Sequence, residues 1–369
     1  MRIGIFGGAF NPPHIGHVNA AKEAVVQYDL DLLLVIPTGK PPHKSLPQGT
    51  PSPEMRFEMA LNAFGNTGYI QVSDIEIFST DNNYTIDTVF TIQHDYPGAE
   101  LFLLVGTDMY ETLDTWRASD ILLKAVAPVL LPRDVIPISS TELRSILPLR
   151  KGREFIAASN YSYIIKYRLY GAKPDWDWLR EKAHSMLDPM RIPHVDACEV
   201  ESLRLSDRWG VNRDDAREAA ILHDITKKLD FNENMCIIAE HGLTFDKPGL
   251  NGEKLLHSIT GALLAQSMFG VSDEIAEAIK WHTTGKAGMT MFEKVIYIAD
   301  YIESTRDFPG VDELRKKAYE NIDDAMVMGL EMTVEDLLSR GIEPDVATYE
   351  ALSELKGNRK ECVHSNETH

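Results

Sequence analysis

The sequence predicts a doubly wound, parallel α/β sheet in the first half of the chain and an all-α domain in the second half. Two observations lead to this fold class. Up to about residue 170, short apolar runs alternate with helical segments, which is typical of parallel strands joined by helices. Beyond a turn with glycine and proline at 171–175, alternating runs of valine and isoleucine nearly vanish and apolar residues recur at helical period.

The first half is predicted to contain strands at 3–6, 32–36, 70–72, 101–105 and 129–131, because these short apolar runs are bounded by turn residues. Helical patterns lie between them at 20–27, 53–63, 85–95 and 119–124. In sheets of this kind, ligands bind at the carboxyl ends of the strands. We therefore expect the functional residues in the loops that follow the strands.

The second half shows helical patterns at 178–187, 195–209, 214–223, 254–269, 273–282, 291–303 and 311–338. With the turn at 171–175 as a linker, we expect two domains, at 1–174 and 175–352. The polar residues 353–369 are predicted to form a flexible tail.

The negative charge is concentrated in the second half. Residues 1–174 have 15 lysines and arginines against 18 acidic residues, a net of −3, and residues 175–369 have 22 against 38, a net of −16. Such an acidic half would repel a nucleic-acid backbone, so we expect small phosphorylated ligands held by local basic groups. The asymmetry also favours two domains of different kinds.

We expect a cytoplasmic protein. No run of 18 apolar residues is present, so neither a membrane span nor a membrane partner is expected. The chain begins directly with a predicted strand, which indicates no signal peptide. Three scattered cysteines form neither a disulfide framework nor a CxxC metal site, which fits a reducing compartment. The oligomeric state cannot be predicted from these features.

The most informative stretch is GIFGGAFNPPHIGH at residues 4–17. Here Gly7 and Gly8 let the backbone approach a ligand closely, and the free N–H groups at the start of the next helix suit a phosphate chain. His14 and His17 would lie beside that anion as hydrogen-bond donors. The alternative is a tight strand-to-helix turn whose histidines are structural or bind zinc, but the glycines on either side of His14 favour phosphate binding.

Two further segments of the first half contain groups suited to phosphate. Lys40 and Lys44 follow the second predicted strand and could hold phosphates, although a solvated, proline-stiffened loop is equally consistent with them. The serines and threonine at 139–141 precede a glutamate and cap a predicted helix, whose N–H groups and Arg144 can hold a triphosphate.

Residues 11–17, with the pattern His-x-Gly-His, resemble the signature of the nucleotidyltransferase superfamily. The whole opening is similar to bacterial nicotinate-nucleotide adenylyltransferases, and residues 138–144 resemble the Ile-Ser-Ser-Thr-x-x-Arg motif of that family. The resemblance implies a Rossmann-like sheet, ATP and nicotinate mononucleotide as substrates, and Mg²⁺ carried by the ATP.

Carried over to this sequence, the resemblance assigns His14 and His17 to the triphosphate and Arg144 to the leaving pyrophosphate. Residues 83–88 resemble the segment that recognises the nicotinate carboxylate, and Trp116 would stack on the pyridine ring. Arg56 and the loop at 37–44 would belong to the surface that faces the substrate. The implied nucleotide-binding residues are Gly7, Gly8, Phe10, Lys44, Tyr84, Thr85, Asp108, Trp116, Ser139, Ser140 and Thr141.

The second half contains a constellation of potential metal ligands. The pattern His-Asp-x-x-Lys occurs at 223–227, and His194, His257, His282 and Asp300 lie on other predicted helices. Four histidines and two aspartates on separate helices suit a two-metal centre in a bundle. Any one of them could be structural, but Asp300 lies in an apolar stretch, where a carboxylate needs a partner or a metal.

This constellation resembles the HD phosphohydrolase superfamily, and residues 281–289 and 297–311 resemble bacterial symmetrical diadenosine tetraphosphatases of the HD type. The resemblance runs from about residue 178 to 349. It implies cleavage of diadenosine tetraphosphate into two ADP at a site with two iron ions, and Asp224 as the residue that bridges them. The implied metal ligands are His194, His223, Asp224, His257, His282 and Asp300, and the phosphate-binding candidates are Lys227, Lys286 and Arg306 with Thr283. Pro193 directly precedes His194, and proline is tolerated only in the first turn of a helix.

The sequence therefore favours a bifunctional enzyme that makes deamido-NAD and hydrolyses a dinucleoside polyphosphate. One alternative is a different HD activity, such as a nucleotidase or a guanosine-polyphosphate hydrolase. Another is a sensor in which a catalytically impaired front domain binds nucleotide and regulates the hydrolase. Only seven residues separate Leu131 from Ser139, fewer than is usual in the adenylyltransferase family, and this short connection is the support for the sensor.

Overall fold

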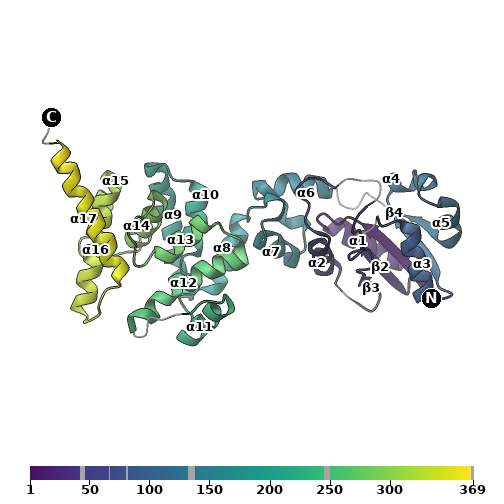
Figure 1. The fold of residues 1–369 in the computed structure, drawn as a ribbon, viewed down its shortest axis with the longest axis horizontal. Coiled ribbons are helices and arrows are strands. Elements are labelled where there is room, and N and C mark those ends of the chain that lie inside the picture. Colours follow the sequence, from purple (N-terminus) through teal and green to yellow (C-terminus); the bar gives the residue numbers. More distant parts are fainter. Residues whose placement is uncertain (42–45, 66, 80–81, 132–137, 245–249, 367–369) are drawn as a thin grey trace. The chain divides into compact units, whose positions relative to one another are not determined.

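The computed structural model describes residues 1–369 except 42–45, 66, 80–81, 132–137, 245–249 and 367–369. It divides into two compact units, Met1–Asp175 and Trp176–His369 (Figure 1). The first unit contains a parallel sheet with helices, and the described part of the second contains helices and no strand. The fold class predicted for each half is therefore confirmed.

The sheet of the first unit consists of β1 (Arg2–Gly8), β2 (Leu32–Pro37), β3 (Ile70–Val72), β4 (Glu100–Val105) and β5 (Ala127–Leu130). Their order in the sheet is β3-β2-β1-β4-β5, and every neighbouring pair is parallel. The chain thus winds outward from β1 in both directions. Gly7 and Gly8, expected in a turn, instead continue β1 and pair with Ile36 and Pro37 of β2.

Helices cover both faces of this sheet. On one face, α1 (Ile15–Gln27) and α2 (Pro53–Phe64) place residues such as Ala21 and Phe64 against Phe6, Leu33 and Val35. On the other face, α3 (Thr85–Asp95) and α5 (Ser119–Ala125) pack against alternate residues of the same strands. Because both faces are covered, the strands read as continuous apolar runs, which is why they could be recognised in the sequence.

Three shorter or later helices complete the first unit: α4 (Thr107–Tyr110), α6 (Ser140–Ile146) and α7 (Ala158–Lys166). The sequence analysis predicts the start of α6 but not α4 or α7. Ser139 caps α6, since its hydroxyl accepts a hydrogen bond from the N–H of Glu142 at 3.1 Å. This helix start follows directly on residues that are not described.

The second unit is built from α8 (Trp176–Met186), α9 (Ile192–Trp209), α10 (Arg213–Leu222), α11 (Phe231–Glu240), α12 (Leu250–Phe269), α13 (Asp273–Trp281), α14 (Met291–Ile302), α15 (Val311–Glu320), α16 (Ile322–Ser339) and α17 (Val346–Asn366). The helix α14 is its centre, because every residue from Val295 to Ala299 is at most 1 % exposed. This burial surrounds the helix that carries Asp300.

Three features of the second unit differ from the sequence expectations. The segment 311–338 is two helices, because Asn321 leaves helical geometry and caps α16 through its side chain. The helix α11 was not predicted. The helix α17 extends to Asn366, so its backbone is helical over most of the range 353–369, where a flexible tail was expected.

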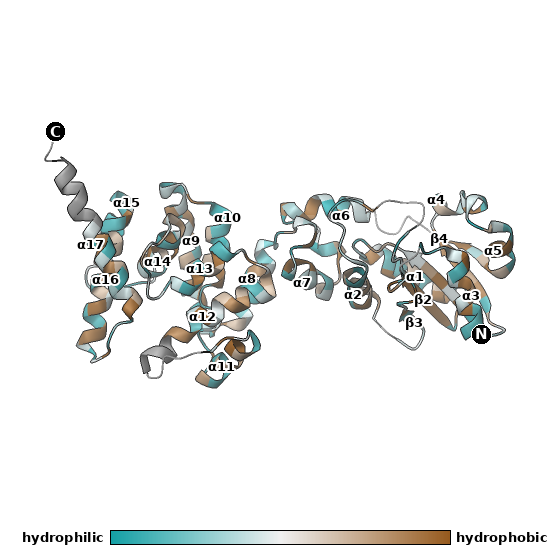
Figure 2. Cartoon of the chain, in the orientation of Figure 1, coloured by the Kyte–Doolittle hydropathy of each residue, from teal (hydrophilic) through white to brown (hydrophobic). Residues whose placement is uncertain are grey.

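The distribution of hydropathy agrees with this packing. Figure 2 shows hydrophobic strands in the sheet of the first unit, whereas the helices of both units combine hydrophobic and hydrophilic residues. Among the described residues, no helix combines the length and the apolar character that crossing a membrane requires.

Candidate functional sites

The first unit contains a cavity of about 570 Å³ at the carboxyl ends of β1 and β4. Its volume lies in the range of pockets that hold nucleotides and similar small ligands. The residues that line it include Gly7 and Gly8, the start of α3, and the segment from Gly106 to Arg117. Thus the cavity lies at the edge of the sheet where the sequence predicts a ligand.

The glycines and Phe10 contribute to this site in different ways. A Cβ atom at Gly7 would meet nothing within 4 Å, so the backbone there faces open space. Phe10 is only 2 % exposed, and its ring packs edge-on against those of Phe6 and His17, with centroid distances of 5.4 Å in both cases. Its side chain therefore supports His17 from behind and does not line the cavity.

The rings of His14 and His17 lie against each other at the start of α1, tilted by 42°. Their ring centroids lie 3.8 Å apart, and Nδ1 of His17 accepts a hydrogen bond from the backbone N–H of His14 at 3.2 Å. An Nδ1 atom that accepts leaves the proton of a neutral imidazole on Nε2, which makes His17 a hydrogen-bond donor. Nδ1 of His14 is buried and has no hydrogen-bond partner within the described part of the chain.

Burial lowers the pKa of both histidines. The pKa of His14 falls to about 4, and that of His17 falls to about 3, where the neighbouring His14 adds to the effect of burial. Both rings are therefore neutral near pH 7. Neutral imidazoles can donate hydrogen bonds to an anion but bring no positive charge to it.

The helix α6 docks against the loop that contains these histidines. Nη1 of Arg144 donates to the carbonyl of Asn11 at 2.6 Å, and the hydroxyl of Ser140 donates to the carbonyl of Pro12 at 2.9 Å. Nη2 of Arg144 also donates to the hydroxyl of Thr141 at 3.0 Å. The two phosphate motifs of the sequence, more than 120 residues apart, thus meet at one place.

Tyr84, Thr85, Asp108 and Trp116 line the cavity, whereas His14, His17 and the residues of α6 are not among its lining residues. Tyr84 occupies the capping position of α3, and Thr85 is the first helical residue. Two lining residues were not foreseen. Arg117 lies over the ring of Tyr84 at 4.3 Å, and burial raises the pKa of Glu76 despite a hydrogen bond from Thr88.

Arg56 does not face the substrate, contrary to the sequence expectation. It is fully buried, and its guanidinium donates to the carbonyls of Ala9 at 2.9 Å and Gly39 at 3.0 Å. It therefore links the loop that contains Ala9 to the loop that contains Gly39. Lys40 is exposed on the second of these loops, and Lys44 lies outside the described residues.

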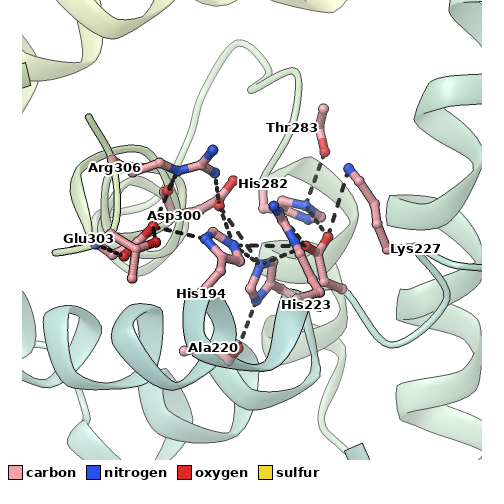
Figure 3. A network of polar contacts seen from close by, with 12 residues as sticks. His194, Ala220, His223, Lys227, His282, Thr283, Asp300, Glu303 and Arg306 are labelled. Atoms are coloured by element: carbon pink, nitrogen blue, oxygen red, sulfur yellow. Dashed lines mark hydrogen bonds and ion pairs between the residues drawn. The ribbon is translucent and has the colours of Figure 1, made fainter. Parts of the chain in front are cut away.

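In the second unit, the six candidate metal ligands converge on one point (Figure 3). His194 lies in the first turn of α9, where Pro193 occupies one of the first two positions, as a proline in a helix should. His223 and Asp224 follow the end of α10, and His282 follows α13. His257 and Asp300 lie on α12 and α14.

Asp224 is at the centre of this group and is fully buried. Its Oδ2 lies 3.4 Å from Nε2 of His223 and 3.8 Å from Nε2 of His194. Its Oδ1 lies 3.4 Å from Nε2 of His257 and 3.6 Å from Nε2 of His282. Each oxygen of this carboxylate therefore faces a different pair of histidines. Asp300 joins the first pair, with Oδ1 at 3.0 Å from Nε2 of His194.

The other ring nitrogens are held by the protein. Nδ1 of His223 lies 2.7 Å from the carbonyl of Ala220, and Nδ1 of His282 lies 2.6 Å from the carbonyl of Ile279. Nδ1 of His194 contacts the buried carboxylate of Glu303 at 3.0 Å. A proton donated from Nδ1 leaves Nε2 as the atom available to a metal.

The donor set fits two metal ions. Within each histidine pair the Nε2 atoms are 3.3 Å apart, a close approach of two potential lone pairs that a cation would relieve. Oδ1 of Asp224 is buried without a hydrogen-bond partner in the described residues. Burial raises the pKa of Asp224 and Asp300, but the surrounding basic groups outweigh it and hold both pKa values well below the ordinary range. Both carboxylates are therefore ionised, as metal ligands are.

Basic side chains border the cluster. Nζ of Lys227 lies 2.9 Å from Nε2 of His257, and Arg306 donates to Asp300 at 2.7 Å. The hydroxyl of Thr283 lies 3.1 Å from Nε2 of His282. Lys286, predicted to bind phosphate, does not border the cluster. It pairs instead with Glu277 and Glu293 and lines a separate cavity.

Sequence reasoning missed Arg191 and Glu303 at this site. Nε of Arg191 donates to Oδ2 of Asp224 at 2.6 Å, and Glu303 accepts from His194. A signal for both was present. Arg191 precedes His194 by three positions, and Glu303 follows Asp300 by three, which is one helical turn in each case.

Both units are similar to known proteins. Residues 5–146 match the model of cytidylyltransferase-like proteins, and residues 194–305 match that of the HD domain. A "Probable nicotinate-nucleotide adenylyltransferase" of Shouchella clausii is 36 % identical over 173 residues, which cover 47 % of this chain and 86 % of the relative. A "Bis(5'-nucleosyl)-tetraphosphatase, symmetrical" of Bacillus subtilis is 41 % identical over 151 residues, which cover 41 % of this chain and 81 % of the relative. The chain therefore belongs to the cytidylyltransferase-like family in its first unit and to the HD family in its second.

A solved structure of a predicted HD superfamily hydrolase involved in NAD metabolism, from Clostridium acetobutylicum, covers 51 % of this chain and all of its own, with 31 % identity and a TM-score of 0.48. The range matched by the cytidylyltransferase-like family includes His14, His17 and Arg144. The range matched by the HD domain begins at His194 and includes all six candidate ligands.

Proposed function

We propose that the chain is a bifunctional cytosolic enzyme. Its first unit transfers the adenylyl group of ATP to nicotinate mononucleotide, which gives deamido-NAD and pyrophosphate. Its second unit hydrolyses diadenosine tetraphosphate symmetrically into two ADP. The observation that supports both assignments best is that the candidate site residues gathered in each unit lie inside the range matched by that unit's own family.

Adenylyl transfer needs positioning and charge stabilisation more than acid–base chemistry. The phosphate of nicotinate mononucleotide attacks the α-phosphorus of ATP, and pyrophosphate leaves with its Mg²⁺. His17 offers its Nε2 proton to the triphosphate, and the start of α6 adds backbone N–H groups together with Arg144. Neutral histidines suit this task because they donate without binding the ground-state anion as strongly as a cation would.

The nicotinate end of the cavity supports a preference for the acid over the amide. Arg117, whose guanidinium also lies 3.8 Å from the exposed carboxylate of Asp87, adds a positive charge where Trp116 and Thr85 line the cavity. A carboxylate gains from this charge, whereas a neutral amide gains less. The preference is measured as the ratio of kcat/KM for nicotinate and nicotinamide mononucleotides.

For the hydrolase we propose two transition-metal ions, most simply iron, held by His194, His223, Asp224 and Asp300 on one side and by His257, His282 and Asp224 on the other. Mixed histidine and carboxylate ligands favour iron, manganese or zinc over calcium. When bound, such ions supply Lewis acidity to the attacking water and to the phosphate. Lys227 and Arg306 then neutralise phosphate oxygens, and Glu303 fixes the ring of His194.

Product analysis on the full chain tests the proposal. Purified protein with its metal content measured should convert diadenosine tetraphosphate into ADP alone, and ATP plus nicotinate mononucleotide into deamido-NAD. The appearance of AMP and ATP from the first substrate would exclude symmetrical cleavage. Metal-dependent hydrolysis of other phosphoesters, without adenylyl transfer, would favour an HD phosphohydrolase regulated by its front unit.

A further inference from the structure

The loop that contains the His-x-Gly-His motif is held from behind by a residue far along the chain. The hydroxyl of Tyr170 donates to Oδ1 of Asn11 at 2.8 Å, across 159 positions of sequence. Tyr170 lies beyond the range 5–146 matched by the cytidylyltransferase-like family and five positions before the end of the first unit. The last residues of this unit therefore reach back to its nucleotide loop.

The side-chain amide and the backbone carbonyl of Asn11 bond to three different residues. Its carbonyl accepts from Arg144 at 2.6 Å, its Nδ2 donates to the hydroxyl of Thr50 at 3.0 Å, and its Oδ1 accepts from Tyr170. Asn11 itself is only 4 % exposed. Since Asn11 is three residues before His14, its contacts constrain the backbone that carries the two histidines.

The backbone around Tyr170 indicates that this contact is enforced. Arg168 and Tyr170 have φ angles of 47° and 61°, in the left-handed region that non-glycine residues rarely adopt, and Gly171 follows at 67°. Such strain persists only where the surrounding structure determines it, and it occurs preferentially at functional sites. Here the left-handed turn accompanies a hydroxyl that points into the nucleotide loop.

We propose that Tyr170 is a positioning residue of the adenylyl-transfer site, which acts through Asn11 on the loop that presents His14 and His17. This inference rests on the proposed adenylyltransferase function. It gives the segment that leads out of the first unit a part in nucleotide binding. Tyr170 does not line the cavity, so its effect on the reaction is indirect.

The test compares two tyrosine-to-phenylalanine variants of the full chain. Tyr170→Phe removes the hydroxyl that holds Asn11. Tyr161→Phe is the matched control, because Tyr161 is 1 % exposed and its hydroxyl accepts from the N–H of Asp175 at 2.7 Å, in the same unit but away from the nucleotide loop. Tyr170→Phe should lower kcat/KM for ATP by about five- to tenfold, the effect of one hydrogen bond. Tyr161→Phe should leave kcat/KM unchanged, although both variants lower Tm to a similar extent.

A double variant and an assay of the second unit extend the test. In the background Asn11→Ala, the additional change Tyr170→Phe should have no further effect on kcat/KM, because the contact is already lost. Equal kcat/KM for Tyr170→Phe and Tyr161→Phe would reduce Tyr170 to a structural residue. Diadenosine tetraphosphate hydrolysis by the same preparations should be unaffected and reports on the integrity of the second unit.

The failure of the proposed activity and the failure of this inference are distinguishable through binding of Mg·ATP, measured by calorimetry. If the wild type binds Mg·ATP but transfers no adenylyl group, the activity is wrong, and the inference is decided by whether Tyr170→Phe weakens Kd by the same five- to tenfold. If the wild type does not bind Mg·ATP, both are overturned.

Discussion

The two candidate sites of this chain are built from different parts of the polypeptide. In the first unit the site is made of strand ends, loops and helix starts, and its residues are brought together by hydrogen bonds to backbone carbonyls, such as those of Arg56 and Arg144. In the second unit it is made of side chains from helices, and the imidazole orientations of His223 and His282 are fixed within one turn of their own helices.

This difference teaches where each activity is vulnerable. The hydrolase site depends on the identity of a few buried ligands, so a single side-chain change should eliminate it. The proposed transferase site would depend on the placement of a loop, so changes at Asn11 and Tyr170, which hold that loop, should affect it.

The largest effect is expected for Asp224→Ala. Because the two oxygens of Asp224 face separate histidine pairs, its loss should remove both metal positions, abolish hydrolysis of diadenosine tetraphosphate and leave adenylyl transfer unchanged. Metal content by mass spectrometry and the two activities are the measurements. The control is Asp312→Ala, whose exposed carboxylate pairs with Arg315 on the surface. A variant that retained two metals per chain would show that Asp224 is not the bridge.

The corresponding change in the first unit is His17→Ala. It should lower kcat for adenylyl transfer by about 10²–10³, equivalent to ~3–4 kcal/mol, because it removes a preorganised donor to the transition state. Hydrolysis should not change. His94→Ala is the control, since His94 is exposed on α3. Turnover equal to that of the wild type would remove His17 from the mechanism.

The two sites also differ in how far they could be predicted from the sequence. The strands were found because β2 and its neighbours are buried on both faces and read as apolar runs. The six candidate ligands of the second unit could be singled out in the sequence because each is chemically distinctive by itself. The contacts of Asn11 with Arg144 and Tyr170 could not be predicted, because these partners lie 133 and 159 positions away in the sequence and no local pattern marks them.

Other omissions had local signals that were available. The helix α11 begins with a capping box of Asp230 and Glu233, and the break before α16 lies at Asn321, a residue typical of helix starts. Lys286 shows the opposite error. A lysine close in sequence to His282 was expected at the phosphates, but two nearby glutamates bind it elsewhere. Charge pairing of that kind depends on the fold.

The stability of the first unit should depend on pH through His14 and His17. The pKa values of His14 and His17, about 4 and about 3 in the folded chain, lie below the ordinary value of 6.5. Between pH 6.5 and 4 the unfolded chain therefore binds more protons, so these histidines reduce the stability of the first unit as pH falls. The limit is ~1.4 kcal/mol per pH unit for each histidine.

Thermal unfolding of a chain comprising residues 1–175, followed from pH 7.5 to 4.5, measures this effect. The double variant His14→Asn and His17→Asn should show a shallower decline of Tm below pH 6.5 than the wild type. The control His94→Asn should decline as the wild type does, because His94 is exposed. Parallel curves for the double variant and the wild type would show that the two histidines keep ordinary pKa values when folded.

The smallest effect is expected when the two units are separated. The structure places the cut after Asp175, because the backbone groups of Lys173, Pro174 and Asp175 bond to Leu147, Arg150 and Tyr161 of the first unit. The next residue, Trp176, begins α8 and lies under the guanidinium of Arg217 at 4.4 Å. Chains 1–175 and 176–369 should each retain the activity of their own site within about twofold of the intact chain, since, among the described residues, neither site uses a residue of the other unit.

A first unit that ends at residue 169 is the sharper comparison, because it lacks Tyr170. It should bind Mg·ATP more weakly than 1–175, and equal binding by the two would show that the segment after α7 has no part in the nucleotide site.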